Sequence, residues 1–126
     1  MKKRKKVLII EDDKFIVKAM KYKFEDAKFQ VKTFSSVEAG LKLLAQWTPD
    51  VIILDILLPG TDGFAFLRET RHNPKLKNIP IIVASNLPED TDIEPGENTG
   101  YTEYIVKSDL DLEELVKKAK KLSLSI

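Results

Sequence analysis

Two kinds of hydrophobic pattern alternate along the chain. Short, wholly apolar runs rich in β-branched residues occupy residues 7–10, 51–54 and 81–84. Runs of this length and composition are typical of strands that are buried on both faces of a sheet. Residues 29–34 instead alternate apolar and polar side chains, which indicates a strand near a sheet edge with one face in water. A last short strand is expected over residues 104–106.

Helical spacing separates these strands. Apolar residues recur three or four positions apart around residues 16–24, 37–45, 64–71 and 112–122. Ser35 and Glu38 have the spacing of a capping box at the start of the second of these helices. Asp111, with Glu114 three residues later, is the expected cap of the last one.

Residues 88–99 have the weakest helical signal. A crossover helix is expected there because neighbouring parallel strands need a long connection. Pro95 and Gly96, however, would stop or kink such a helix. We therefore expect a fourth helix that is short or irregular.

Five successive strand–helix units predict one α/β domain with a parallel, doubly wound sheet and helices on both faces. We expect this domain to cover residues 6–126 and residues 1–5 to form a basic N-terminal tail.

Polar residues follow four of the predicted strands: Glu11, Asp12, Asp55, Ser85 and Lys107. Because parallel strands end at the same edge of a sheet, we expect these five side chains to gather there. Three carboxylates beside one lysine can hold a divalent cation such as Mg²⁺, which prefers oxygen ligands. Taken singly, each residue has a plainer interpretation, as a helix cap, a turn residue or a solvated surface lysine.

Composition narrows the possible functions. The formal net charge is +1, of which the basic run at residues 2–6 contributes five positive charges, so the rest of the chain is acidic. This balance argues against a domain that grips nucleic acid by bulk charge. No aromatic residue or second basic strand accompanies the run in sequence, so a solvated tail is expected. Cysteine is absent and His72 stands alone in a turn, which argues against a zinc site.

The motifs VLIIEDD, VIILDILLPGTDGF, PIIVASN and YIVKSD, in this order and spacing, resemble the receiver domain of two-component response regulators. The resemblance covers about residues 6–122 and is to the single-domain, chemotaxis-regulator kind. It implies a flavodoxin-like sheet with the strand order 2-1-3-4-5.

The resemblance also implies a phosphorylation site. Asp55 would accept a phosphoryl group from a phosphohistidine on a sensor histidine kinase or a phosphotransfer protein. Glu11, Asp12, Asp55 and the backbone carbonyl of Leu57 would hold Mg²⁺ or Mn²⁺. Such a protein is a signalling switch and assists its own phosphorylation and dephosphorylation, but it is not an enzyme with a separate product.

Three further residues have roles by the same resemblance. Ser85 would donate a hydrogen bond to a phosphoryl oxygen, and Lys107 would pair with another. Tyr104 matches the aromatic residue that changes position on phosphorylation, which we favour over the alternative of a tyrosine half-packed at a strand end.

Two departures from the family pattern affect the site. Ser108 follows the lysine where the family usually has a proline in a cis bond, which leaves open whether the bond from Lys107 to Ser108 is cis. Leu57 and Leu87 lie two residues after Asp55 and Ser85, where side chains flank the phosphoryl group. We expect these two leucines to shield the acyl phosphate from water.

Two alternatives remain. One is a receiver-like interaction module that is not phosphorylated, and the other is a flavin or nucleotide binder, which the lack of a glycine-rich phosphate loop disfavours. For the leading interpretation we expect a cytoplasmic protein that is a monomer or weak homodimer, with an unknown downstream protein target. We expect neither nucleic-acid binding nor membrane insertion.

Overall fold

Five parallel strands form one sheet in the computed structural model, which describes residues 4–58, 61–86 and 101–124. In spatial order the strands are β2 (Gln30–Phe34), β1 (Lys6–Ile10), β3 (Val51–Leu54), β6 (Ile81–Ser85) and β7 (Glu103–Val106). Counted along the chain this is the order 2-1-3-4-5, so the predicted flavodoxin-like sheet is confirmed. A small antiparallel ribbon of β4 (Leu57–Leu58) and β5 (Thr61–Asp62) follows β3.

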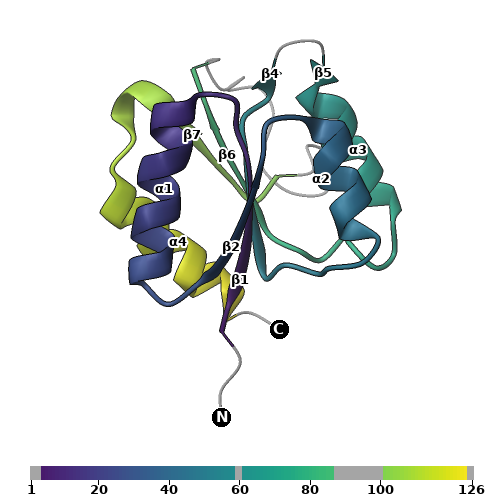
Figure 1. Ribbon diagram of the computed structural model, residues 1–126. Coiled ribbons are helices and arrows are strands. Elements are labelled where there is room, and N and C mark those ends of the chain that lie inside the picture. The colour runs from purple at the N-terminus through teal and green to yellow at the C-terminus, as the bar shows by residue number, and fades with distance from the viewer. Residues whose placement is uncertain (1–3, 59–60, 87–100, 125–126) are drawn as a thin grey trace.

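Helices cover both faces of the sheet (Figure 1). On one face lie α1 (Lys14–Asp26) and α4 (Leu112–Ser123), and on the other α2 (Val37–Leu44) and α3 (Gly63–His72). Successive strand residues enter opposite halves of the core, as Ile9 does on the α1 side and Ile10 on the α2 side. The apolar runs in β1 and β3 are therefore buried on both faces, as predicted.

Side-chain caps fix the starts of three helices. Asp13 Oδ1 accepts the N–H groups of Phe15 and Ile16 at the start of α1, and Asp111 caps α4 as predicted. The predicted cap at Ser35 is wrong by one residue, because Ser36 Oγ accepts the N–H of Ala39 at 3.2 Å. Ser36 has the extended backbone of a cap, so the third residue of α2 is Ala39 rather than the glutamate of the expected capping box.

Gly63 allows α3 to begin close to the segment that follows β3. A Cβ at this position would overlap the Cα of Ile56 and lie 2.7 Å from its Cβ. Because Ile56 directly follows Asp55, the close approach of α3 helps to fix the backbone beside that aspartate.

The remaining predictions concern the periphery. β2 lies at the sheet edge, as its alternating pattern predicted. His72 is exposed. The irregular helix predicted over residues 88–99 lies outside the described residues. Among the helices that the structure describes, none has the length and apolar character needed to cross a membrane.

Candidate phosphorylation and metal site

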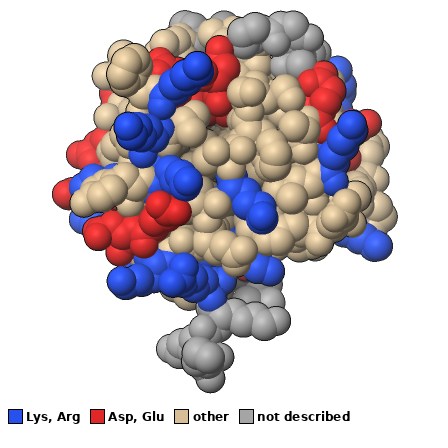
Figure 2. All heavy atoms as spheres, in the orientation of Figure 1, with Lys and Arg blue, Asp and Glu red and all other residues tan. Residues whose placement is uncertain are grey.

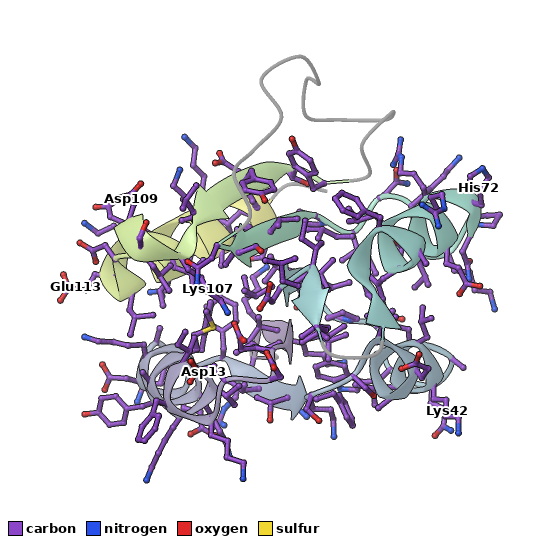
Figure 3. All side chains as sticks on the ribbon, turned by 90° about the horizontal axis from the view of Figure 1, so that it is seen from above. Asp13, Lys42, His72, Lys107, Asp109 and Glu113 are labelled. Carbon is purple, nitrogen blue, oxygen red and sulfur yellow. The ribbon has the colours of Figure 1, made fainter. Side chains whose placement is uncertain are left out.

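The carboxyl ends of the parallel strands meet at one edge of the sheet, which Figure 3 views from above. Glu11 and Asp12 follow β1, Asp55 follows β3 and Lys107 follows β7. One carboxylate oxygen of each acid lies within 4.8 Å of the others. The structure thus brings together the three acids that the sequence predicted at this edge.

Lys107 is the cation at the centre of this cluster. Its Nζ lies 2.7 Å from Oε1 of Glu11 and 2.7 Å from Oδ2 of Asp55, and only 10% of its side chain is exposed. Burial by itself would lower the pKa of Lys107, but hydrogen bonds to the two carboxylates outweigh it and the pKa is raised. The lysine is therefore charged at neutral pH and holds the two acids together.

Glu11 is anchored by the start of α1. Its Oε2 accepts the N–H groups of Asp12 at 3.0 Å and of Asp13 at 3.1 Å, while Oε1 faces Lys107. Burial raises the pKa of the Glu11 carboxyl, and the hydrogen bonds from Lys107 and the backbone oppose that rise. Added positive charge near Glu11 would therefore favour its ionised form.

Asp55 is held at both of its oxygens. Oδ1 accepts the N–H of Leu57 at 2.9 Å, and Oδ2 contacts Lys107. The backbone of Asp55 is fixed as well, because its N–H donates to the carbonyl of Ile10 at 3.0 Å. This carboxylate therefore has a defined position with little conformational freedom.

Asp12 is the exposed acid of the cluster, whereas Glu11 and Asp55 are buried. The three acids outnumber the lysine that neutralises them, which leaves formal negative charge at the solvent side of the site. Oxygen ligands of this kind suit Mg²⁺ or Mn²⁺, which keep several waters and take one or more carboxylates from the protein. The residues present therefore fit a divalent cation.

Ser85 and Tyr104 lie on the neighbouring strands. Ser85 is fully buried at the end of β6 and pairs in register with Val106, the residue before Lys107. Tyr104 is half-buried in β7 and packs edge-to-face on Tyr101, with 5.5 Å between the ring centroids. Ser85 therefore ends its strand at the same edge as the acids, and Tyr104 precedes Lys107 by three residues.

The predicted flanking residues are seen only in part. Leu57 is half-exposed, with 51% of its surface open to solvent beside Asp55. Leu87 lies outside the described residues. The bond from Lys107 to Ser108 is trans, since none of the described residues has a cis peptide, and Lys107–Asp109 form a 3₁₀ turn.

Sequence patterns did not predict the backbone donors of the site. The N–H groups of Asp12, Asp13 and Leu57 orient the two buried carboxylates. Every residue except proline has such a group, so no side-chain signal could have singled out these three.

Comparisons with known proteins agree with this geometry. The transcriptional regulatory protein AfsQ1 of Streptomyces coelicolor is 40% identical over 101 residues, which cover 80% of this chain and 44% of that protein. The chain thus spans less than half the length of the curated relatives that it matches.

Solved structures match over nearly the whole chain. The chemotaxis response regulator CheY4 of Vibrio cholerae has a TM-score of 0.83 and 26% identity, covering 95% of this chain and 99% of that one. The Mn²⁺-bound form of response regulator Rcp1 has a TM-score of 0.74 and 25% identity, covering 96% and 93%. Residues 7–120 match the response regulator receiver domain, and the chain belongs to this family of signalling switches.

Proposed function

We propose that Asp55 is the phosphoacceptor of this receiver domain and takes a phosphoryl group from a phosphohistidine of a sensor kinase or phosphotransfer protein. The observation that carries the proposal is the contact of Lys107 with Asp55 and Glu11, with Asp12 beside them. The acyl phosphate is the signal, which a change in the interaction surface then transmits to a downstream protein.

The transfer makes one bond and breaks one. A carboxylate oxygen of Asp55 attacks phosphorus, the P–O bond forms, and the P–N bond to the donor imidazole breaks. The freed imidazole nitrogen then carries the electron pair of that bond. Lys107 would balance the charge that spreads over the phosphoryl oxygens, and such positioned charge is the main source of catalysis in phosphoryl transfer.

Glu11, Asp12, Asp55 and the backbone carbonyl of Leu57 would hold Mg²⁺ or Mn²⁺. When bound, the ion would supply positive charge that offsets the negative charge of the phosphoryl group. Support comes from the clustering of the three carboxylates and from the Mn²⁺-bound state of the similar regulator Rcp1. The backbone N–H groups of Asp12, Asp13 and Leu57 orient the carboxylates of Glu11 and Asp55 that would bind the ion.

Ser85 and Tyr104 form the switch in this proposal. The Ser85 hydroxyl donates to a phosphoryl oxygen, which draws the end of β6 toward Asp55. Tyr104, on the adjacent strand, then changes its packing. The half-buried position of Tyr104 supports this role, because a partly exposed ring can move without opening a cavity in the core.

The test is phosphorylation by a small donor. Incubation with acetyl phosphate and Mg²⁺, followed by intact-mass measurement, should add one phosphoryl group. Asp55→Asn should abolish this gain, and Asp26→Asn, an exposed aspartate at the end of α1, is the matched control that should retain it.

The same experiment distinguishes the main alternative. If acetyl phosphate and phosphoramidate both leave the mass unchanged with Mg²⁺ present, the chain is a receiver-like interaction module that is not phosphorylated. Cytoplasmic location belongs to the proposal too.

A further inference from the structure

On its outer edge, β2 has backbone N–H and C=O groups that form no hydrogen bond with another strand in the described part of the protein. β2 is the last strand of the sheet. On its inner side, the N–H of Gln30 donates to Lys5 O at 2.7 Å, and Phe34 O accepts from Glu11 N at 3.0 Å. Since alternate residues of a parallel strand bond to the same neighbour, Val31 and Thr33 direct their N–H and C=O groups outward.

A groove runs between this edge and α1. Its volume is about 470 Å³. Thr33 and Ser35 line the β2 side, and Lys14, Lys18 and Lys21 line the α1 side. The groove therefore offers an open strand edge, two hydroxyl groups and a row of ammonium groups.

The three groove lysines have no anionic partner among the described residues. Their spacing of four and three residues places them on one flank of α1, where all three are exposed. Lys23 of the same helix, by contrast, lies 3.8 Å from Glu113 of α4. The three lysines thus form no ion pair within the described structure, although Glu11 and Asp12 also line the groove.

The opposite side of the β2 edge is basic as well. The ammonium groups of Lys32 and Lys6 lie 5.5 Å and 5.8 Å from the ring centroid of Trp47. Folding therefore brings Lys32 of β2 and Trp47 beside Lys6, although no aromatic residue lies near the basic run in sequence. Figure 2, which faces this edge, shows Lys and Arg side chains over α1 and near the centre of the view.

We infer that the β2 edge binds an extended, acidic peptide segment of a partner protein as an additional strand of the sheet. Backbone groups of Val31 and Thr33 would pair with the peptide main chain, as in other cases of strand addition. Acidic side chains at alternate positions of the peptide would face Lys14, Lys18 and Lys21.

Charge determines which strand can occupy this edge. Lysines beside an edge strand prevent pairing with neutral or basic strands. They also disfavour a second copy of this chain, because two lysine-lined edges would repel each other. The ammonium groups of these lysines instead attract an acidic peptide. The inference does not rest on phosphorylation, so it stands or falls separately from the proposed function.

The probe is a short, fluorescein-labelled peptide in which glutamate alternates with threonine and valine. Its binding to the full chain is measured by fluorescence anisotropy, with the glutamine version of the peptide as its control. Because exposed ion pairs are individually weak, the triple variant K14Q/K18Q/K21Q should weaken binding about tenfold. The triple variant K117Q/K120Q/K121Q on α4 has the same charge change and should bind as the wild type does.

The strand geometry has its own tests. Thr33→Pro removes an outward N–H that would pair with the peptide, so it should abolish binding. The variant should still fold, because proline is tolerated at edge positions whose N–H faces away from the sheet. In the wild-type chain, hydrogen exchange at the amides of Val31 and Thr33 should slow when the peptide is bound, a readout that needs no variant.

Five results would overturn the inference, the first four of which come from the binding and exchange measurements. These are no binding of the glutamate peptide, equal binding by a single-stranded oligonucleotide of the same charge, unchanged affinity in K14Q/K18Q/K21Q, and unchanged exchange at Val31 and Thr33. Self-association of the chain through this edge, measured by sedimentation, would assign the surface to a second copy and would overturn it as well.

Discussion

Lysines in two regions of this molecule have opposite surroundings. At the carboxyl edge of the sheet, Lys107 is 10% exposed and contacts two carboxylates at 2.7 Å. Along the β2 edge, Lys14, Lys18 and Lys21 are exposed and have no ion pair with any described residue. A buried charge must be paired within the fold, whereas an exposed charge is stabilised by water. The site around Lys107 is therefore already ordered by contacts within the fold. The lysines beside β2 form no ion pair within the described structure and can interact with an external partner.

The largest difference between the two regions is expected in the free energy of unfolding, when the buried lysine is removed. Lys107→Ala leaves Glu11 and Asp55 buried without their cation, so the free energy of unfolding should fall by roughly 3–5 kcal/mol in EDTA. Urea denaturation measures this loss. Mg²⁺ should restore part of the stability, because it supplies positive charge to the same carboxylates.

Lys18→Ala is the matched control in the open groove. It removes an exposed, unpaired lysine and should change stability by no more than about 0.5 kcal/mol. Equal losses in the two variants would show that burial does not distinguish the two regions.

A smaller effect is expected at the backbone that supports the buried site. Gly63→Ala places a methyl group against the Cα of Ile56, which cannot move without shifting Asp55. We expect a loss of about 1–3 kcal/mol and slower phosphorylation by acetyl phosphate. Thermal denaturation and intact-mass time courses measure the two effects.

Gly40→Ala is the comparison for this prediction. The added Cβ at Gly40 would meet mainly the flexible Cδ1 of Ile10, 2.6 Å away, and the substitution improves helix propensity in α2. A loss as large as that of Gly63→Ala would contradict the role assigned to the Ile56 backbone.

The sequence predicted the buried region better than the open one. Whereas the strand order came from the family resemblance, the parallel sheet and the gathering of Glu11, Asp55 and Lys107 follow from apolar runs and from the rule that parallel strands end at one edge. These are regular consequences of backbone geometry, so local patterns are enough to find them.

The parts that were missed depend on single positions or on distant contacts. The cap of α2 was predicted at Ser35 but lies at Ser36, because the two adjacent serines fit almost the same sequence pattern. Only the position of the first helical residue distinguishes them. The lysines beside β2 and the position of Trp47 near Lys6 require the fold itself, since residues far apart in sequence define that surface. Which charges are left unpaired is likewise a property of the tertiary structure.

A kinetic effect is expected from the exposed leucine of the buried site. Leu57 follows Asp55 by two residues, and its half-exposed apolar side chain cannot orient an attacking water. Leu57→Asn adds such a group and should shorten the lifetime of the acyl phosphate severalfold, as followed by intact mass after removal of the donor. Leu124→Asn, at an exposed leucine beyond α4, is the control; equal lifetimes in wild type and Leu57→Asn would exclude the shielding role.

The smallest effect couples the two regions. Glu11 and Asp12 also line the groove beside β2, so their negative charge opposes an acidic peptide there. If the proposed metal site and the proposed peptide site are both correct, Mg²⁺ should raise the affinity of the glutamate peptide about twofold, because screening limits the interaction of exposed charges. Asp12→Asn removes one of these charges and should have a similar effect without Mg²⁺. If neither Mg²⁺ nor Asp12→Asn changes the affinity for the peptide, the groove and the phosphorylation site are electrostatically independent, even though they share two residues.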